Sequence, residues 1–347
     1  MKNIRKMSQS ALMLISALAF VTMISGPSIG AEVMKIKPKG DKKITIGVLD
    51  LNAAIEIAAL FNKEHKAAAE KRGWGIQISD LKDNIPQGPT YMENMISAGF
   101  DGIIIHWCVL KSIDKQLKIA FDKGIPVITM ANLGARFPGV LAEVGPQEAT
   151  MAATSAEYLA AKLQTGDKVL FLDMPMIEQG QVRVTGAKGI FQAYNIKVAQ
   201  ELQFQASGDP FQWSYEQTKN TLLGDTKKEL KGIWTSWEGF GISAARAAHD
   251  LGRDDIVVVT CDDSPNTYSE IRKLPTFHAT TGYANQSKDL NEQVFAILEK
   301  VFKGEPVESQ RFYPFIARLV TKDNLPPKGY FINPCGSYKG RPDFEVK

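Results

Sequence analysis

Cysteine is scarce in this sequence, which has only Cys108, Cys261 and Cys335 among 347 residues. An odd number permits at most one internal disulfide and excludes a small scaffold held together by several bridges. Cys108 and Cys261 each end an apolar run. We therefore expect buried thiols that behave as small hydrophobic side chains, with a single disulfide as the alternative.

Beyond its N-terminal segment, the chain has no excess of positive or negative charge. The formal charge of the whole chain is +3, and its first 31 residues hold three basic and no acidic side chains, which leaves 3 − 3 = 0 for the rest. This balance gives no electrostatic reason to bind nucleic acid or an anionic membrane surface. We expect neither partner.

Signatures of catalysis are missing as well. Beyond residue 31 the sequence has no Gly-x-Ser-x-Gly elbow, no His-Glu-x-x-His pair and no Gly-x-x-x-x-Gly-Lys-Ser/Thr loop. His106 and Cys108 are two apart on a predicted strand, where side chains point the same way without having to touch, and two ligands without a third make a weak metal site. We expect a non-catalytic protein without metal or cofactor; an exported hydrolase is the alternative.

No apolar run is long enough to span a membrane. The longest, Ala11–Ile24, has 14 residues, whereas a spanning helix needs about 20. It follows a basic start and precedes Gly26-Pro27 and small residues, which is typical of a secretory signal peptide. We expect residues 1–31 to be removed after Gly30 or Ala31, leaving a soluble periplasmic protein of about 316 residues (347 − 31). A DNA-binding repressor would need a helix-turn-helix in that place.

Short β-rich runs alternate with longer helical patterns over the rest of the chain. Such alternation, with continuously apolar runs, predicts an α/β fold with parallel sheets covered on both faces. The predicted strands are Ile44–Leu49, Gly75–Ser79, Gly102–His106, Val127–Met130, Lys168–Leu172, Val198–Leu202, Gly232–Thr235, Ile256–Thr260 and His278–Thr281. The predicted helices are Ala53–Arg72, Ser112–Asp122, Gln147–Leu163, Phe240–Leu251 and Ser287–Phe302, each followed by a glycine within a few residues.

The alternation runs twice, once before about residue 140 and once after it, which predicts two similar doubly wound lobes. After Thr321 the sequence is rich in proline and glycine and cannot sustain a helix or a central strand. We expect residues 322–347 to lie as a strap on the surface of one lobe.

Several segments resemble one known family. They are Ile44–Val48 before a long helix, Ser97–Ile105, Lys123–Thr129, Lys168–Leu172 and Ile256–Asp262. Over roughly residues 43–320 the chain resembles the type I periplasmic binding proteins of the ribose and galactose kind, which serve ABC importers.

The resemblance implies two parallel-sheet lobes joined by a three-strand hinge, with a ligand clamped between them. It places the crossings near Val140–Val144, Tyr283–Ser287 and Gln310–Phe315. The N-terminal lobe would comprise residues 43–141 plus 285–311, and the C-terminal lobe residues 142–284 plus 312–321. The implied partners are a small carbohydrate-like ligand and a membrane permease, with the protein acting as a monomer.

Asp50, Asn52 and Glu56 lie where the first strand passes into the first helix, and could bond ligand hydroxyls. Asn52 could instead cap the helix, and Glu56 could be an acid in the first turn that the helix dipole favours. The family commonly has an Asn-Pro-Phe-Phe-like stretch here, whereas this chain has Ala53–Glu56 and so lacks those stacking phenylalanines.

Two further strand ends carry polar or aromatic residues. His106 and Trp107 end the third strand and suit a ligand wall, with core packing as the alternative. Asn132 follows the fourth strand. Ribose-binding relatives usually have Asp-Arg at the positions of Ala131 and Asn132, so the resemblance leaves pentose specificity in doubt.

The second lobe offers one arginine and several aromatic residues. Arg183, placed before a helix that ends near Tyr194, could fork onto hydroxyls or a carboxylate, or could be a solvated surface residue. Trp237 and Glu238 occupy positions where the family often has Asn-Asp, and an indole face can stack on a sugar ring. Trp213 could line the mouth or simply pack.

Asp262 ends a fully apolar strand, where an acid is unexpected unless it binds something, and its carboxylate can bridge adjacent hydroxyls. Tyr283 and Asn285 lie at the second expected crossing and could also reach the ligand.

These residues favour a receptor for a neutral sugar, polyol or sugar derivative that delivers it to an ABC importer. A sugar acid held by Arg183, or a nucleoside stacked on Trp107 and Trp237, stays open. A periplasmic sensory protein for a chemoreceptor or sensor kinase would have the same lobes.

Overall fold

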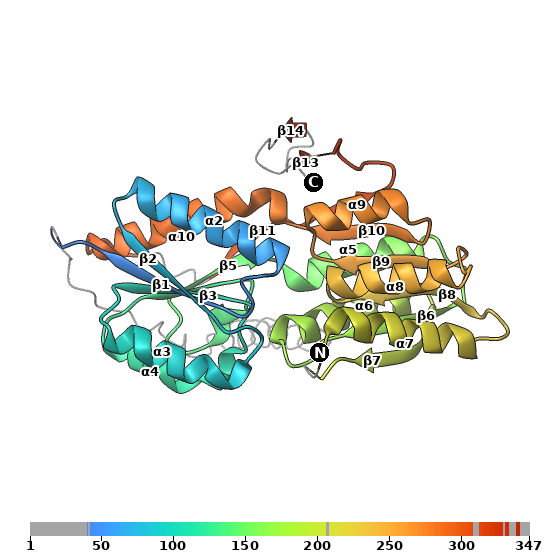
Figure 1. The fold of residues 1–347 in the computed structure, drawn as a ribbon, viewed down its shortest axis with the longest axis horizontal. Coiled ribbons are helices and arrows are strands. Elements are labelled where there is room, and N and C mark those ends of the chain that lie inside the picture. Colours follow the sequence, from blue (N-terminus) through green and yellow to red (C-terminus); the bar gives the residue numbers. More distant parts are fainter. Residues whose placement is uncertain are drawn as a thin grey trace, which may run out of the picture. The chain divides into compact units, whose positions relative to one another are not determined.

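The computed structural model describes residue 40 and residues 42–205, 208–307, 312–328, 330–332 and 338–340. Two six-stranded sheets dominate it (Figure 1). In spatial order the first contains β11 (Phe312–Phe315), β5 (Ala142–Pro146), β4 (Val127–Met130), β3 (Gly102–His106), β1 (Thr45–Asp50) and β2 (Gly75–Asp80). The second contains β12 (Arg318–Thr321), β10 (Phe277–Gly282), β9 (Val257–Cys261), β8 (Leu230–Thr235), β6 (Lys168–Asp173) and β7 (Lys197–Gln203).

Helices cover both faces of each sheet. In the first lobe α2 (Glu56–Lys71) and α10 (Ser287–Phe302) lie on one face, and α3 (Gly88–Ser97) and α4 (Asp114–Asp122) on the other (Figure 1). In the second lobe α5 (Glu148–Ala160) and α6 (Glu178–Ala193) lie opposite α7 (Pro210–Gly224), α8 (Glu238–Asp250) and α9 (Pro265–Lys273). Short 3₁₀ turns are η1 (Ile85–Gln87), η2 (Leu110–Ile113), η3 (Gly134–Arg136) and η4 (Ala284–Gln286).

The predicted α/β fold with two lobes is confirmed. Every predicted strand is present, with ends shifted by two residues at most; of the five predicted helices, Ser287–Phe302 has the predicted ends and the other four have ends shifted by up to three residues. In α2 the apolar residues Ile57, Leu60 and Phe61 are buried at helical spacing, and Gly73 beyond it has φ +67. The apolar residues that repeat with the helical period in this segment therefore form the buried face of α2.

Three helices were not predicted, α3, α7 and α9, although each carries a proline in its first turn. Two also have a side-chain cap: Asp209 accepts from the backbone of Phe211 and Gln212, and Ser264 accepts from Thr267. A capping residue followed by proline at the first helical position is a recognisable start signal.

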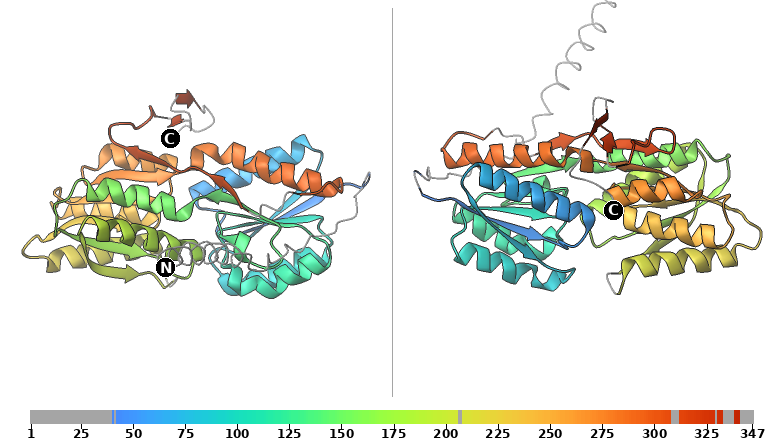
Figure 2. Two further views of the ribbon diagram at one scale, coloured as in Figure 1. Left: turned by 180° about the vertical axis from the view of Figure 1, so that it is seen from behind. Right: turned by 45° about the horizontal axis from the view of Figure 1, so that its top comes forward.

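Two of the three expected crossings lie elsewhere. β5 is paired with β4 in the first sheet, so the chain leaves that sheet after Pro146 and not within 140–144. β11 also belongs to the first sheet and β12 to the second, so the last crossing lies between Phe315 and Arg318 (Figure 2). The crossing after Gly282, through η4, agrees with expectation; Gln310 lies outside the described residues.

Sheet membership also revises the expected limits of the lobes. Residues 142–146 and 312–315 pair in the first sheet, although we had assigned them to the C-terminal lobe. A crossing strand has no sequence feature of its own that shows which sheet it joins, because that depends on long-range pairing.

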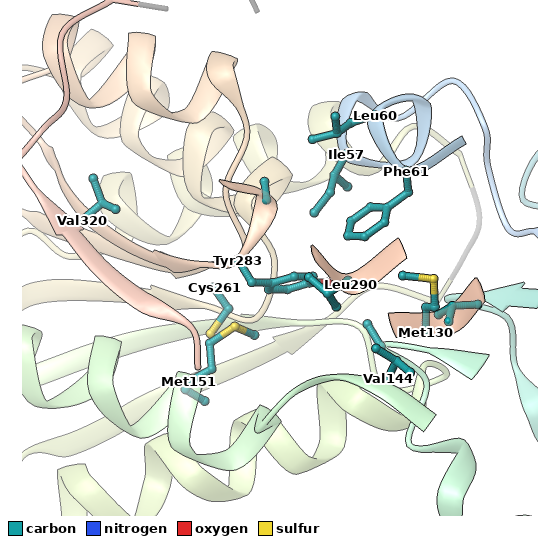
Figure 3. Packing of buried hydrophobic residues seen from close by; sticks show 14 of the residues in the cluster. Ile57, Leu60, Phe61, Met130, Val144, Met151, Cys261, Tyr283, Leu290 and Val320 are labelled. Atoms are coloured by element: carbon teal, nitrogen blue, oxygen red, sulfur yellow. The ribbon is translucent and has the colours of Figure 1, made fainter. Parts of the chain in front are cut away.

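One buried apolar cluster passes through both lobes (Figure 3). Phe61 and Leu290 contribute from the first lobe, Met151 and Cys261 from the second, and Tyr283 lies between them with no exposed surface. Cys108 and Cys261 are both buried free thiols, as expected, whereas Cys335 and the predicted signal peptide lie outside the described residues.

The tail begins along the second lobe. Lys322 donates to the carbonyl oxygens of Leu274 and Pro275 at 3.0 and 2.8 Å, and Arg272 donates to that of Pro326. Farther on, β13 (Tyr330–Ile332) and β14 (Tyr338–Gly340) pair as a separate antiparallel ribbon. Among the described residues, no helix is both long and apolar enough to cross a membrane.

Candidate ligand-binding site

A cavity of about 380 Å³ lies where the loops after several strands of both sheets meet. In open α/β sheets the carboxyl ends of parallel strands are the usual place for a ligand. The cavity is lined by Leu51, Asn52, Ile55, Ile57, Asp83, Ile85, Trp107, Met174, Met176, Ile177, Gln179, Gly180, Arg183, Phe204, Gly208, Asp209, Pro210, Phe211, Ser236, Trp237 and Asp262.

Five of the residues selected from the sequence lie in this wall. They are Asn52, Trp107, Arg183, Trp237 and Asp262. Asn52 does not cap α2; its amide oxygen accepts from the backbone of Ala54 at 3.0 Å and its amide nitrogen donates to Asp83 at 2.6 Å.

Arg183 and Asp262 form the charged floor of the cavity. The guanidinium donates to both carboxylate oxygens of Asp262 at 2.5 and 3.0 Å, to Glu148 at 2.6 Å and to the carbonyl oxygen of Ser236 at 2.7 Å. Arg183 is 3% exposed and lies inside α6, not before a helix, so the alternative of a solvated surface arginine is wrong. Two carboxylates flank one cation, and the floor therefore carries no surplus positive charge.

Burial raises the pKa of several carboxyl groups around this floor. It raises the pKa of Glu148 to about 7, against the opposing charge of Arg183. It raises the pKa of Asp263 to about 6, and burial together with the charge of Asp262 raises the pKa of Glu238 well above its ordinary value. Acids of this kind take up or release a proton near neutral pH when their surroundings change.

Left-handed backbone marks the strand ends at the cavity. Trp107 after β3, Ala131 after β4 and Asp262 after β9 have φ of +47, +51 and +68. Non-glycine residues adopt this conformation at a cost and cluster at functional sites, with Asp among the more tolerant types. The sharp turns bring Trp107 and Asp262 into the cavity wall.

The position of the Trp237 indole is fixed by Gly239 and by two phenylalanine rings. A Cβ at Gly239 would lie 2.3 Å from the indole ring, so only glycine leaves room for the ring over the start of α8. Phe211 and Phe240 contact the same indole with ring centroids 5.2 and 5.4 Å away.

Asp50 and His106 are fully buried beneath the cavity and do not line it. Asp50 accepts from the side chain of Asn62 at 2.7 Å and lies 3.5 Å from Nδ1 of His106. The two ε nitrogens of His106 and His65 are 2.5 Å apart. These side chains contact one another inside the first lobe.

Asn132 is also fully buried and does not line the cavity. Its side-chain nitrogen donates to the carbonyl oxygen of Cys108, and its backbone donates to Glu143 at 2.8 Å. It therefore ties the ends of β3 and β4 together.

Glu56 and Glu238 line a smaller hollow of about 260 Å³ beside the main cavity. Glu56 is exposed in the first turn of α2 and accepts from the backbone of Asn266 in the second lobe at 3.1 Å. Glu238 is 4% exposed in the first turn of α8.

Besides Asp50, His106 and Asn132, three more predicted residues line neither cavity. Trp213 packs between Phe204 and Phe240, with ring centroids 5.4 and 5.2 Å away. Tyr283 is part of the buried cluster, and Asn285 lies half-buried in η4. The role of each as a ligand contact stays a prediction, as it does for the residues in the wall.

The sequence reasoning missed much of the second-lobe wall, namely Met174, Met176, Ile177, Gln179 and Phe204. The first three lie in the loop after β6, Gln179 lies at the start of α6, and Phe204 directly follows β7. Their position shortly after a predicted strand was the feature of the sequence that could have identified them. Within the part of the chain that the structure describes, no three potential metal-ligating side chains come together.

The family described as a periplasmic binding protein domain matches residues 47–306. The chain belongs to this family. It is 23% identical over 290 residues to a xylitol-binding protein of Mycolicibacterium smegmatis, covering 82% of this chain and 78% of the relative. It is 21% identical over 256 residues to a ribose import binding protein of Salmonella typhimurium, covering 73% and 82%. A solute-binding protein of Agrobacterium vitis, solved with bound allitol, has the same fold: the TM-score is 0.75 at 20% identity, over 82% of this chain and 97% of the other.

Proposed function

We propose that this protein is an exported receptor that captures a small polyhydroxylated solute between its lobes and delivers it to an ABC importer. The solute is a sugar, a polyol or a derivative of one. The observation that carries the proposal is a cavity of about 380 Å³ between the strand ends of both sheets, with indole faces and a hydrogen-bonding floor. Ligand sites for small molecules have this size and mixture.

The family and the relatives support the ligand class. Two relatives are named for xylitol and ribose, and a protein of the same fold was solved with allitol. All three are small, neutral and rich in hydroxyl groups. The neutralised floor suits them, because Asp262 and Glu148 already balance Arg183.

The links between the lobes support capture by hinge closure. Among the described residues, the side chain of Gln179 donates to the carbonyl oxygen of Ala131 at 2.9 Å beside the cavity, and the backbone of Asn266 donates to Glu56 at 3.1 Å. A ligand that contacts both walls favours the closed arrangement. The protein acts by binding, without turnover, as a monomer released from its signal peptide.

The test starts from the protein purified from its own compartment. Native mass spectrometry should find a small molecule that leaves on denaturation, and thermal unfolding should shift upward with one of ribose, xylitol or allitol. X-ray scattering should show a smaller radius of gyration with that ligand. A protein that carries nothing and responds to no carbohydrate or polyol would contradict the proposal.

Matched variants test the position of the site. Trp237→Leu should raise Kd about tenfold, or about 1.4 kcal/mol, since it removes a stacking face. Trp74→Leu is the control, because Trp74 is also partly buried but packs on Phe295 and Phe302 in the first lobe. Asp262→Asn keeps a residue that tolerates φ +68 and should also weaken binding. Unchanged affinity in both site variants would place the ligand elsewhere.

A further inference from the structure

The wall of the main cavity is mostly apolar. The second lobe contributes Met174, Met176 and Ile177 from the loop after β6, with Phe211 at the start of α7; we call these four residues the apolar wall. Leu51, Ile55, Ile57 and Ile85 line the cavity from the first lobe.

The apolar wall is only partly covered by the protein, although Met174 and Ile177 also pack against the cores of the lobes. Met174, Met176 and Ile177 are half-buried, and Phe211 is 44% exposed. Apolar surface that gathers in a concave site, and not singly over the surface, indicates a partner that covers it. A free sugar or polyol has hydroxyl groups on nearly every carbon and would leave several of them facing these side chains, where a hydroxyl without a hydrogen bond is costly.

Several polar groups of the lining are already committed to other protein groups. The guanidinium of Arg183 bonds Glu148, Asp262 and the carbonyl oxygen of Ser236. At the opposite wall the side chain of Asn52 bonds Asp83.

One buried acceptor in the lining remains open. The amide oxygen of Gln179, a residue 3% exposed, has no partner among the described residues, whereas its amide nitrogen donates to the carbonyl oxygen of Ala131. A buried acceptor without a partner calls for a donor such as a ligand hydroxyl.

We propose that the ligand is amphiphilic: a hydroxyl-bearing sugar or polyol head that carries an aryl or alkyl substituent. The inference rests on the proposed function and makes its ligand class narrower. The head lies at the floor, where its hydroxyls donate to Gln179 and Asp262. The substituent lies on the apolar wall, opposite Ile55 and Ile57. The head carries no negative charge, because an anionic head would face the carboxylates of Asp262 and Glu148.

The experiment measures Kd for matched pairs of glycosides by calorimetry. The pairs are the methyl, hexyl and phenyl glycosides of glucose, galactose, xylose and ribose, together with the free sugars, xylitol and allitol. For the sugar that binds, we expect the phenyl and hexyl glycosides to bind at least ten times more tightly than the methyl glycoside. The basis is a gain of about fourfold for each buried methylene group.

A variant and its control connect that gain to the wall. Met176→Gln keeps the length of the side chain and should shrink the difference between phenyl and methyl glycosides several-fold. Leu223→Gln, at a position in α7 that is 58% exposed and outside the cavity, should leave both Kd values unchanged. Thermal unfolding of both variants reports whether each is folded.

The outcomes separate the two proposals. Equal or weaker binding of the phenyl and hexyl glycosides, or a co-purified ligand with the formula of an unsubstituted sugar or polyol, would overturn this inference and leave the proposed function standing. Binding of no glycoside, sugar or polyol at all, with no co-purified small molecule, would overturn both. A co-purified ligand whose fragments include a sugar or polyol and an apolar group would support the inference whichever sugar it contains.

Discussion

The two lobes share one strand order but bury different polar groups. The order β2-β1-β3-β4-β5 in the first sheet corresponds to β7-β6-β8-β9-β10 in the second. The first lobe buries two imidazoles, His65 and His106, beside Asp50. The second buries one guanidinium, Arg183, among carboxylates. A common scaffold therefore does not dictate the electrostatics at its strand ends.

The position of these groups differs as well. The imidazole pair lies beneath Trp107 and stays out of the cavity, whereas Arg183 and Asp262 form part of the cavity wall. Both lobes thus offer the ligand apolar and indole surface, and the second also supplies the charged hydrogen-bonding floor. We expect substitutions in the second lobe to affect both folding and binding, and those of the imidazole pair to affect mainly folding.

The largest effect should come from Arg183→Leu. It leaves the carboxylates of Glu148 and Asp262 buried without a cation, which should lower the free energy of unfolding by about 3–5 kcal/mol. Urea unfolding followed by circular dichroism measures this change. Lys118→Leu, which breaks an exposed pair with Asp122 on α4, is the control and should cause no measurable loss. Equal losses in the two variants would show that the buried ion pairs of Arg183 stabilise the fold no more than an exposed pair does.

The corresponding change in the first lobe is His65→Leu. It leaves the ε nitrogen of His106 buried without its partner, so the free energy of unfolding should fall by about 1–3 kcal/mol. Replacing both residues, as His65→Leu with His106→Leu, removes the unpaired group and should cost less than the sum of the single variants. Strict additivity in this double-mutant cycle would show that the imidazoles do not interact.

Raising the pH from acid to neutral should weaken the second lobe. The pKa of Glu148, raised from 4.5 to about 7 by burial with Arg183, Asp262 and Glu143 nearby, means that the folded state binds more protons than the unfolded state between those values. The free energy of unfolding should therefore decline by about 1–3 kcal/mol as pH rises from about 4.5 to about 7, and stay level above it. Glu148→Gln should flatten this decline; an unchanged slope would show that Glu148 ionises normally.

Lowering the pH should weaken the first lobe, whereas raising it weakens the second. We expect the effect on the free energy of unfolding to be smaller in the first lobe. Burial and the neighbouring His106 lower the pKa of His65 well below 6.5, against a hydrogen bond with Asn291 that raises it. The unfolded state then binds more protons below pH 6.5, so stability falls as pH drops below that value. His278 of the second lobe, whose pKa burial lowers to about 4, acts in the same direction. His65→Leu should reduce the acid slope more than His278→Gln, because His278 is only half-buried. A larger reduction of the acid slope by His278→Gln than by His65→Leu would contradict this assignment of the acid effect to the first lobe.

Much of the fold could be predicted because parallel strands covered on both faces are continuously apolar. The run Ile256–Thr260 is one example, and β9 lies over nearly the same residues. The helices α7 and α9 were missed although Asp209-Pro210 and Ser264-Pro265 signal their starts. The strands β5 and β11 could not be assigned to a sheet, because their partners are set by contacts between distant parts of the chain.

The site was predictable where a polar residue follows a strand directly. Asp262 and Trp107 lie in the cavity wall for this reason. The same reasoning placed His106 and Asn132 in the site, but their side chains turn inward to His65 and to the end of β3. A difference of one residue along a strand end reverses the direction of the side chain, and the left-handed turn that decides it leaves no clear mark on the sequence.

By itself the sequence determined the two-lobed parallel architecture, since apolar runs and helical periods are local properties of the chain. It also determined which residue types stand at the strand ends. Only the tertiary structure decided that Arg183 is neutralised by Asp262 and Glu148, and that methionine, isoleucine and phenylalanine side chains complete the wall. The physical reason is that charge balance and cavity shape depend on groups that are up to 211 residues apart (262 − 51) and meet only after folding.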